Sequence, residues 1–419
     1  MPPVTSGVLA DGTMSETMLA NGVRVLSERV AGVRSVAVGV WVRHGAAHDA
    51  PHVSGASHLL EHMVFKGTGR RTAHEIALSL EVLGGSLDAY TTREHTGFQA
   101  RVLDEHLPLA LDVLADLTLH PLLRVEDLAL EREVVLEEIA EVEDTPDDLV
   151  FELHGQELWP GSPFGRSILG TPGTVGCVDV DALRELHDRA YRGANLVVAA
   201  AGSVDHGAFV AAAETLFGSV DGGERESSVP LPGSPRVGDL RVERDTVQSH
   251  IVIGTALPGH PDPSRYPLVL LSSALGGGMS SRLFQRIREE MGLCYSVFTH
   301  QTFYVGCGTG GVYLGTRPAT EERAVGAVRE ELARVAAEGL PPQELAQAKQ
   351  QVKGQVMLSL ESTGARLGRL TGFALNDEPW ISPDQLLARV DAVGAEAVHE
   401  VADRYFHPAR QLVLRLGPI

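Results

Sequence analysis

The sequence predicts an α+β fold of two duplicated domains, each a mostly antiparallel mixed β-sheet packed with helices. Valine-rich strand-like runs alternate with amphipathic helical runs along the 419 residues. "YRGANLVVAAAG" from Tyr191 and "FHPARQLVLRLG" from Phe406 are 215 residues apart (406 − 191 = 215). "VAVGVWV" from Val36 and "IVIGTAL" from Ile251 share that offset, which indicates a duplication. We expect the two copies to form a clamshell.

Each element of the first half carries a local signal. Valine-rich runs that end near glycine predict a pair of strands. Apolar residues at helical spacing, stopped by proline or started by aspartate, predict helices. The predicted strands are Val23–Val30 and Ser35–Gly45, and the predicted helices lie within Glu105–Pro121, Val125–Asp148 and, before a buried strand, Asp179–Val204.

A stretch rich in Gly, Ser and Pro separates the two halves. "SVDGGERESSVPLPGSPRVGD" covers residues 219–239 and has the composition of a linker. It predicts an N-terminal domain at 1–220, a linker at 221–238 and a C-terminal domain at 239–419.

Composition excludes several classes of protein. The formal net charge of −20 argues against nonspecific nucleic-acid binding, which needs a basic face. The three cysteines are widely spaced, so neither a disulfide framework nor a cysteine metal site is indicated. The N-terminus lacks a secretory signal, and no run reaches the roughly 18 apolar residues of a membrane span. We expect a cytoplasmic protein without membrane partners.

The stretch "GASHLLEHMVFKGT" contains the strongest motif. His58 and His62 lie four residues apart, on one helical face, so both imidazoles can bind one metal ion. Glu61 is close enough to take a proton from a water molecule on that ion, as catalytic zinc requires. The alternative is a core helix with hydrogen-bonded histidines. The pattern and its helical context favour a zinc hydrolase in which Glu61 is the general base.

A third metal ligand is expected on the acidic helix. Glu131 and Glu138 are seven residues apart and share a partly apolar face, where buried carboxylates need a metal or a histidine as partner. Most glutamates of this run are expected to be solvated, and spacing alone does not choose among them. The candidates are Glu131, Glu133, Glu137, Glu138, Glu141 and Glu143.

These motifs resemble the pitrilysin/insulinase family of inverted-motif zinc peptidases over essentially the whole chain. "HLLEHMVFKGT", "LEVLGGSLDAYTTREHT" and "LEREVVLEEIAEVEDTPDD" carry the resemblance, which is closest to the mitochondrial processing peptidase branch and its bacterial relatives. The resemblance implies that Glu138 completes the zinc site, with Glu137 the weaker choice. It implies that Glu131 is the partner of a histidine ligand.

The second half lacks these residues. At the 215-residue offset, His58, Glu61 and His62 correspond to Ser273, Gly276 and Gly277, so we expect one zinc ion per chain, in the N-terminal domain. The glycine run Gly276, Gly277 and Gly278 resembles a substrate-handling loop of the noncatalytic processing-peptidase subunit. Together with an intact zinc motif, it favours a self-sufficient homodimer; a heterodimer with a related subunit is the alternative.

Further residues are assigned by the same resemblance. Phe284, Arg288 and Tyr295 match a family pattern in which the arginine and the tyrosine reach the substrate. Tyr295 can hydrogen-bond the oxyanion and Arg288 can hold the substrate backbone. The alternative places Arg288 in a surface ion pair with Glu289 or Glu290, and Tyr295 in a core strand.

The run "SLDAYTTREHTGF" alternates like a strand. In the family, the equivalent strand is a sheet edge that receives the substrate as an added strand. Asp88, Ala89 and Tyr90 are therefore the candidate peptide-binding residues. Asp88 stands where the family pattern leads us to expect asparagine, which favours basic substrate side chains.

The sequence thus predicts a zinc metalloendopeptidase that hydrolyses small or unfolded peptides with a zinc-activated water. The alternative is a noncatalytic subunit, or a catalytic one that needs a hetero-partner, in a processing-peptidase-like complex. The intact metal-binding and base residues favour the enzyme.

Overall fold

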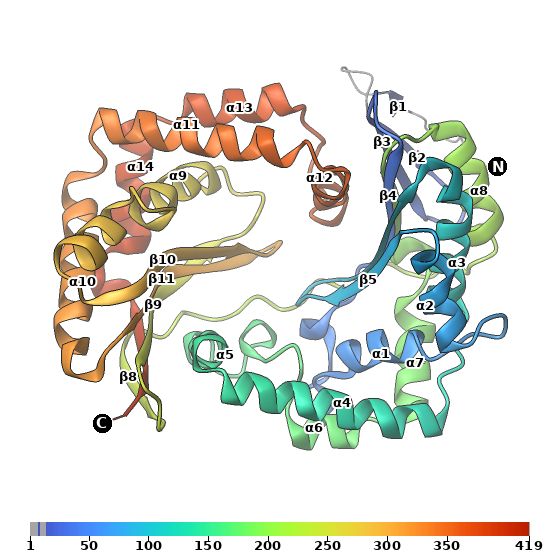
Figure 1. The fold of residues 1–419 in the computed structure, drawn as a ribbon, viewed down its shortest axis with the longest axis horizontal. Coiled ribbons are helices and arrows are strands. Elements are labelled where there is room, and N and C mark those ends of the chain that lie inside the picture. Colours follow the sequence, from blue (N-terminus) through green and yellow to red (C-terminus); the bar gives the residue numbers. More distant parts are fainter. Residues whose placement is uncertain (1–6, 9–13, 419) are drawn as a thin grey trace. The chain divides into compact units, whose positions relative to one another are not determined.

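The structure, a computed structural model, describes residues 7–8 and 14–418 and divides into two compact units. The first unit comprises residues 1–139, 167–229 and 359–380, and the second comprises 140–166, 230–358 and 381–419. Each contains one mixed sheet packed with helices, which confirms the predicted α+β class (Figure 1). The domain boundaries expected from the sequence stay a prediction.

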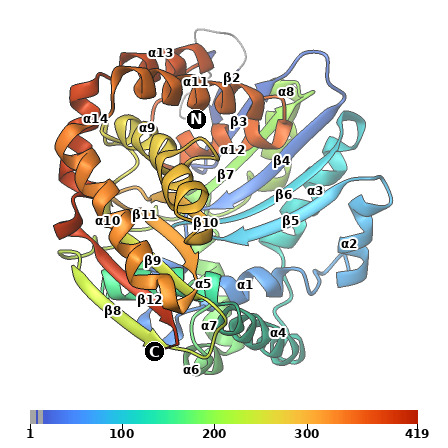
Figure 2. The ribbon, with the colours of Figure 1, turned by 60° about the vertical axis from the view of Figure 1, so that its left-hand side comes forward.

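The first unit has a seven-stranded sheet in the order β1-β2-β3-β7-β4-β6-β5 (Figure 2). All neighbours are antiparallel except β3 and β7. The strands are β1 Gly7–Val8, β2 Met14–Met18, β3 Arg24–Arg29, β4 Ser35–Val42, β5 Ser86–Thr91, β6 Thr96–Leu103 and β7 Leu196–Gly202.

Helices cover both faces of this sheet. Val36, Val38 and Val40 of β4 face a core that includes helix residues Leu59 and Leu114. The opposite face carries Ala37 and Trp41 of β4 and is covered by α12. The helices of the unit are α1 Ala56–Val64, α2 Ala73–Glu81, α3 Leu107–Leu119, α4 Val125–Asp144, α6 Pro172–Cys177, α7 Val180–Ala190, α8 His206–Phe217 and α12 Thr363–Leu375.

The second unit has a five-stranded sheet in the order β10-β11-β9-β12-β8. Only β12 and β8 are parallel. Its strands are β8 Gly238–Glu243, β9 Ser249–Pro258, β10 Cys294–Phe303, β11 Cys307–Thr316 and β12 Leu412–Gly417. Its helices are α5 Pro146–Leu158, α9 Arg265–Gly276, α10 Glu321–Glu338, α11 Pro342–Ser359, α13 Pro383–Ala392 and α14 Ala395–Val401, with π-helices at Phe284–Glu290 and Ala402–Phe406.

The two sheets repeat one topology. The order β5-β6-β4-β7-β3 in the first unit corresponds to β10-β11-β9-β12-β8 in the second, and the parallel pair falls at the same place. This order corrects one expectation. The runs Val23–Val30 and Ser35–Gly45 form strands, as predicted, but they do not pair with each other, because β7 lies between β3 and β4.

Each unit also takes one helix from the other half of the sequence. Helix α12, late in the chain, packs on β3, β4 and β7 of the first sheet. Helix α5, from the N-terminal half, covers β9 and β12 of the second sheet with Leu149 and Val150. The central strands β4, β7, β9 and β12 are therefore buried on both faces, whereas the outer strands β5, β8 and β10 are partly exposed. Within the described part of the chain, no helix has both the length and the apolar character that a membrane crossing requires.

Candidate metal centre

Helix α1 carries the histidine motif, and its N-terminus is held by specific contacts. Gly55 precedes it with φ +96°, and a Cβ there would lie 2.5 Å from the Leu169 carbonyl oxygen, so glycine is required. The buried Asp49 carboxylate accepts hydrogen bonds from the Gly55 and Ser57 amides at 3.0 and 3.2 Å. This carboxylate satisfies free amides at the helix start. The register of α1 is therefore fixed immediately before His58.

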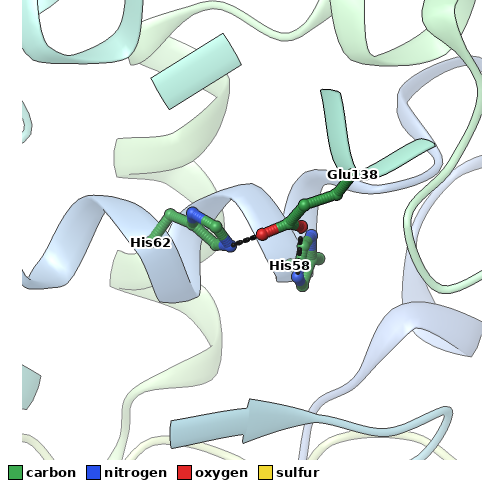
Figure 3. Close-up of side chains that lie close together, drawn as sticks. All are labelled: His58, His62 and Glu138. Atoms are coloured by element: carbon green, nitrogen blue, oxygen red, sulfur yellow. Dashed lines mark ion pairs between the residues drawn. The ribbon is translucent and has the colours of Figure 1, made fainter. Parts of the chain in front are cut away.

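His58, His62 and Glu138 converge on one point (Figure 3). One ligand atom from each lies within 4.8 Å of the others. The Glu138 carboxylate points between the two rings, with Oε2 3.6 Å from His58 Nε2 and Oε1 3.6 Å from His62 Nε2. Glu138 comes from α4, so residues far apart in sequence form one set of donors in the first unit.

The donor set fits a zinc ion. Separations of 3.6 Å exceed ordinary hydrogen-bond lengths. They approach the ~3.3 Å between neighbouring ligands that bond lengths of about 2.05 Å give in a tetrahedral site. Burial, followed by the charge of His62, lowers the pKa of His58 to about 4, so its imidazole is neutral at pH 7 and can be a ligand. A neutral His58 adds no positive charge beside Glu138, and a bound metal ion would supply that charge.

Glu131, two helical turns before Glu138 on the same face of α4, lies beside His62. Glu131 is buried, and its Oε2 lies 3.1 Å from His62 Nδ1. A carboxylate only accepts hydrogen bonds, so this contact needs the proton on Nδ1 and leaves the Nε2 lone pair directed toward Glu138. Lys66 forms an ion pair with the other oxygen, Oε1. The structure places Glu131 where the family resemblance implied a partner for a histidine ligand.

Glu61 lies on α1, between His58 and His62, and is buried. Its Oε2 accepts a 2.6 Å hydrogen bond from the Thr91 hydroxyl on β5. Burial raises the pKa of Glu61, and the Thr91 hydrogen bond opposes that shift by favouring the ionised form. The carboxylate is therefore held beside the donor set with a proton affinity above that of an exposed glutamate.

The remaining glutamates of α4 lie away from the donors. Glu133, Glu137, Glu141 and Glu143 are exposed, whereas Glu131 is buried and Glu138 is partly buried. Among the residues that the structure describes, the group that can hold a metal ion is His58, His62 and Glu138. The helix thus separates its acidic residues into a solvated face and a face toward α1.

The predicted peptide-binding residues lie on β5, the strand at one edge of the first sheet. Asp88 is exposed, and Ala89 packs against the core on the α1 side. Tyr90 accepts a 2.9 Å hydrogen bond from Trp41 Nε1, on the opposite face. Thr91 ends the strand and binds Glu61, so the edge strand and the candidate base are directly linked.

Arg288 and Tyr295 belong to the second unit. The Arg288 guanidinium stacks between two aromatic rings, 4.5 Å from the Phe284 centroid and 4.9 Å from the Tyr295 centroid. Tyr295 is 76% exposed, so the alternative of a core tyrosine is wrong. Arg288 also lies 3.8 Å from Glu289, a surface ion pair. The structure thus joins Phe284, Arg288 and Tyr295, while their catalytic role stays a prediction.

The glycine run Gly276, Gly277 and Gly278 ends helix α9. A Cβ on Gly276 would lie 2.5 Å from the Thr299 amide nitrogen of β10, and one on Gly277 would lie 2.7 Å from Ser273 Cα. Close packing of α9 on β10 therefore explains Gly276, whereas Gly277 is required by the backbone of the last turn of α9 at Ser273. A Cβ on Gly278 would meet its nearest atom, Gln351 Nε2, at 3.6 Å, which is ordinary contact. The expected substrate role of the run stays a prediction.

Sequence reasoning missed two residues of this site, Lys66 and Thr91. Lys66 is four residues after His62, a spacing that places it on the same face, but a lone lysine normally indicates solvent. Thr91 is 30 residues from Glu61 and carries no spacing signal. Both become visible only through tertiary contacts.

The fold and the donor set together are typical of metallopeptidases with the inverted histidine motif. Residues 24–172 match the family described as insulinase (peptidase family M16), and residues 178–352 match the peptidase M16 inactive domain. The chain belongs to peptidase family M16, as the sequence motifs predicted.

Curated relatives of this chain are named zinc proteases. An uncharacterized zinc protease of Streptomyces coelicolor is 38% identical over 400 residues, covering 93% of this chain and 87% of that protein. An uncharacterized zinc protease of Bacillus subtilis is 36% identical over 386 residues, covering 92% of this chain and 94% of that protein. The names of these relatives imply zinc as the metal.

Two solved structures share the fold. A peptidase M16 inactive domain from Pseudomonas fluorescens aligns with TM-score 0.91 and 20% identity over 97% of this chain and 98% of that one. A protease from Helicobacter pylori aligns with TM-score 0.88 and 20% identity over 99% of this chain and 100% of that one. At this identity the likeness shows the fold alone.

Proposed function

We propose that this chain is a zinc metalloendopeptidase acting on small or unfolded peptides. The observation that carries the proposal is the convergence of His58, His62 and Glu138 beside the buried carboxylate of Glu61. This combination offers a divalent metal neutral nitrogen and carboxylate ligands, and it keeps a base within reach. The names of the curated relatives support zinc.

In the proposed reaction, Glu61 moves the proton. When bound, zinc supplies Lewis-acid polarisation of a carbonyl and acidifies a water molecule. Glu61 Oε2 accepts from Thr91, so Oε1 is the atom that takes a proton from the attacking water and returns it to the leaving amine. The raised pKa of Glu61 suits this exchange, because the carboxylate must both accept and release the proton near neutral pH.

The substrate is expected to lie along β5. An edge strand binds an extended peptide through main-chain hydrogen bonds, which tolerates many sequences and excludes folded chains. The exposed carboxylate of Asp88 favours basic side chains in the substrate. Arg288 and Tyr295 are proposed to hold the substrate backbone and to donate to the oxyanion, respectively.

Glu61→Gln tests the proposal, because it removes the base and keeps the size of the side chain. Hydrolysis of a fluorogenic peptide should fall by about 10³-fold or more, while zinc content stays at one ion per chain. The matched control is Glu137→Gln, on the exposed face of α4, which should keep full activity. Undiminished activity of Glu61→Gln would refute the assigned base.

A noncatalytic or partner-dependent subunit is the alternative function. The match of residues 178–352 to an inactive domain fits a second half in which the described residues form no group of metal donors, while the first unit keeps His58, His62 and Glu138. Activity of the purified single gene product would exclude both alternatives. Its mass in solution tests the proposed homodimer.

A further inference from the structure

We propose that Lys66 is a positioning residue of the metal centre, which holds Glu131 against His62 and ties the helix bearing the histidines to the helix bearing the glutamates. The inference rests on the proposed zinc function and adds a residue that the histidine motif does not contain. Lys66 makes these contacts through both its side chain and its backbone.

The side chain of Lys66 forms an ion pair with a buried carboxylate, that of Glu131. Glu131 is 6% exposed and has two oxygens, of which Oε2 faces His62 Nδ1 and Oε1 faces Lys66 Nζ. A buried ionised carboxylate needs a partner on each side. Without the ammonium group, Oε1 has no cation, and the carboxylate is no longer held in the position that orients His62.

The backbone of Lys66 makes a second link between the same helices. Lys66 directly follows the last turn of α1, and its amide donates to the Met63 carbonyl at 3.1 Å. Its own carbonyl accepts a 2.9 Å hydrogen bond from Arg124 Nη2, and Arg124 immediately precedes α4. Lys66 therefore joins α1 to the start of α4 through its backbone and to the middle of α4 through Glu131.

The contact between Glu131 and His62 is important for the metal centre. His62 Nδ1 has a partner in Glu131, whereas His58 Nδ1 is buried without a hydrogen-bond partner among the described residues. Of the two imidazoles, His62 is thus the one whose orientation is set by a hydrogen bond through its Nδ1. A ligand whose orientation is not fixed must be ordered when the metal binds, which weakens affinity.

The test measures zinc affinity by competition with a chromophoric chelator, using the full-length protein. Lys66→Met should weaken zinc binding about tenfold, and Lys66→Arg, which keeps a cation near Oε1, should restore most of it. Lys353→Met is the matched control, because Lys353 pairs with Asp391 in the second unit. It should leave zinc affinity unchanged within about twofold.

A double-mutant cycle separates positioning from general damage. In a Glu131→Gln background, Lys66→Met should change zinc affinity by less than about twofold, because the lysine then has no carboxylate to hold. Wild-type affinity in Lys66→Met, an equal loss in the Glu131→Gln background, or an equal loss in Lys353→Met would each overturn the inference. If Lys66→Met does not fold, the Lys66→Gln variant serves in its place, with the same expected loss.

The results that would refute the proposed peptidase function differ from those that would refute the role of Lys66. A protein that binds zinc but hydrolyses no peptide would refute the peptidase while leaving the Lys66 result interpretable. A wild-type chain that binds no zinc would overturn both.

Discussion

The first and second units share the order of five strands. They differ in the side chains of the first helix after the second of these strands, which is α1 in the first unit and α9 in the second. After β4, helix α1 offers His58, Glu61 and His62 toward the α4 glutamates. After β9, helix α9 ends at Gly276, which allows close packing on β10. The sheet thus positions a helix in both units, and the side chains on that helix decide whether a metal centre results.

The comparison teaches that the chemistry is local to a few contacts on a repeated scaffold. Outside the donor set, the central strands of both sheets are covered on two faces, and both sheets receive a helix from the other half of the sequence. What the first unit adds is the pair of long-range contacts, Glu138 to the histidines and Glu131 to His62.

Zinc should stabilise the first unit alone. At a free zinc concentration a thousandfold above Kd, binding stabilises the competent state by about 4 kcal/mol. Hydrogen exchange should therefore slow markedly in α1 and α4 and remain unchanged in α9. Magnesium, which prefers oxygen ligands, is the control and should slow neither helix. Equal zinc protection in α1 and α9 would contradict the assignment of a single site.

The buried histidines of the second unit should make it acid-sensitive. His154 is buried on α5, and burial lowers its pKa to about 4, against 6.5 for an exposed histidine. Between these pH values the unfolded chain binds a proton that the folded unit does not, so stability present above about pH 6.5 is lost as the pH falls toward 4. The shift corresponds to about 3 kcal/mol as an upper bound.

His154→Gln should reduce that pH dependence in urea titrations at pH 7 and pH 5, while other histidines whose pKa is lowered by burial, such as His300 and His95, keep the remainder. The exposed His52 provides the matched control, since His52→Gln should leave the difference between the two pH values unchanged. A variant whose pH dependence equals that of the wild type would show that His154 is not the sensitive group.

Ion pairs near α12 and on α5, the helices that each unit takes from the other half of the sequence, should contribute differently to the free energy of unfolding. Asp377 follows α12 and pairs with Arg43, Arg24 and Arg225, and Arg43 is only 9% exposed at its side chain. Asp377→Asn should cost about 1–2 kcal/mol, because it removes the carboxylate from a buried guanidinium. On α5, the exposed pair Glu157–Arg236 is the counterpart, and Glu157→Gln should cost less than about 0.5 kcal/mol. Equal losses in urea unfolding would remove the distinction.

The smallest expected effect concerns the link between β5 and the base. Thr91→Val removes the hydroxyl that donates to Glu61 Oε2 and keeps the branched shape. kcat should fall about three- to tenfold with little change in zinc content, since one neutral-to-charged hydrogen bond is lost. Thr91→Ser keeps a hydroxyl and should retain most of the rate. A Thr91→Val enzyme with wild-type kcat would show that Glu61 needs no such support.

Much of the fold could be predicted from local patterns, but the order of the strands could not. Helix α7 begins after Asp179 and α4 ends before Thr145-Pro146, as the capping residues predict. The predicted pairing of β3 with β4 was wrong, because β7, which begins 154 residues after the end of β4 (196 − 42 = 154), lies between them. Helix α5 was missed: Pro146 was taken only as a helix end, although proline is equally suited to the first turn of a new helix.

The site divides in the same way. The spacing of His58, Glu61 and His62 is local, so the sequence alone indicates a metal helix. Glu138 was chosen by family resemblance, because helical spacing left several glutamates of α4 equally placed. Lys66 and Thr91 act through contacts that depend on how α1, α4 and β5 pack, and no sequence period encodes them.

The most direct test of the account compares zinc binding by two neighbouring glutamate variants. Glu138 lies between the histidines and Glu137 faces solvent, although they are adjacent on α4. Metal analysis after dialysis should find one zinc ion per chain in the wild type and in Glu137→Gln, and far less in Glu138→Gln. Equal zinc retention in both variants would contradict the central claim that Glu138 completes the metal centre with His58 and His62.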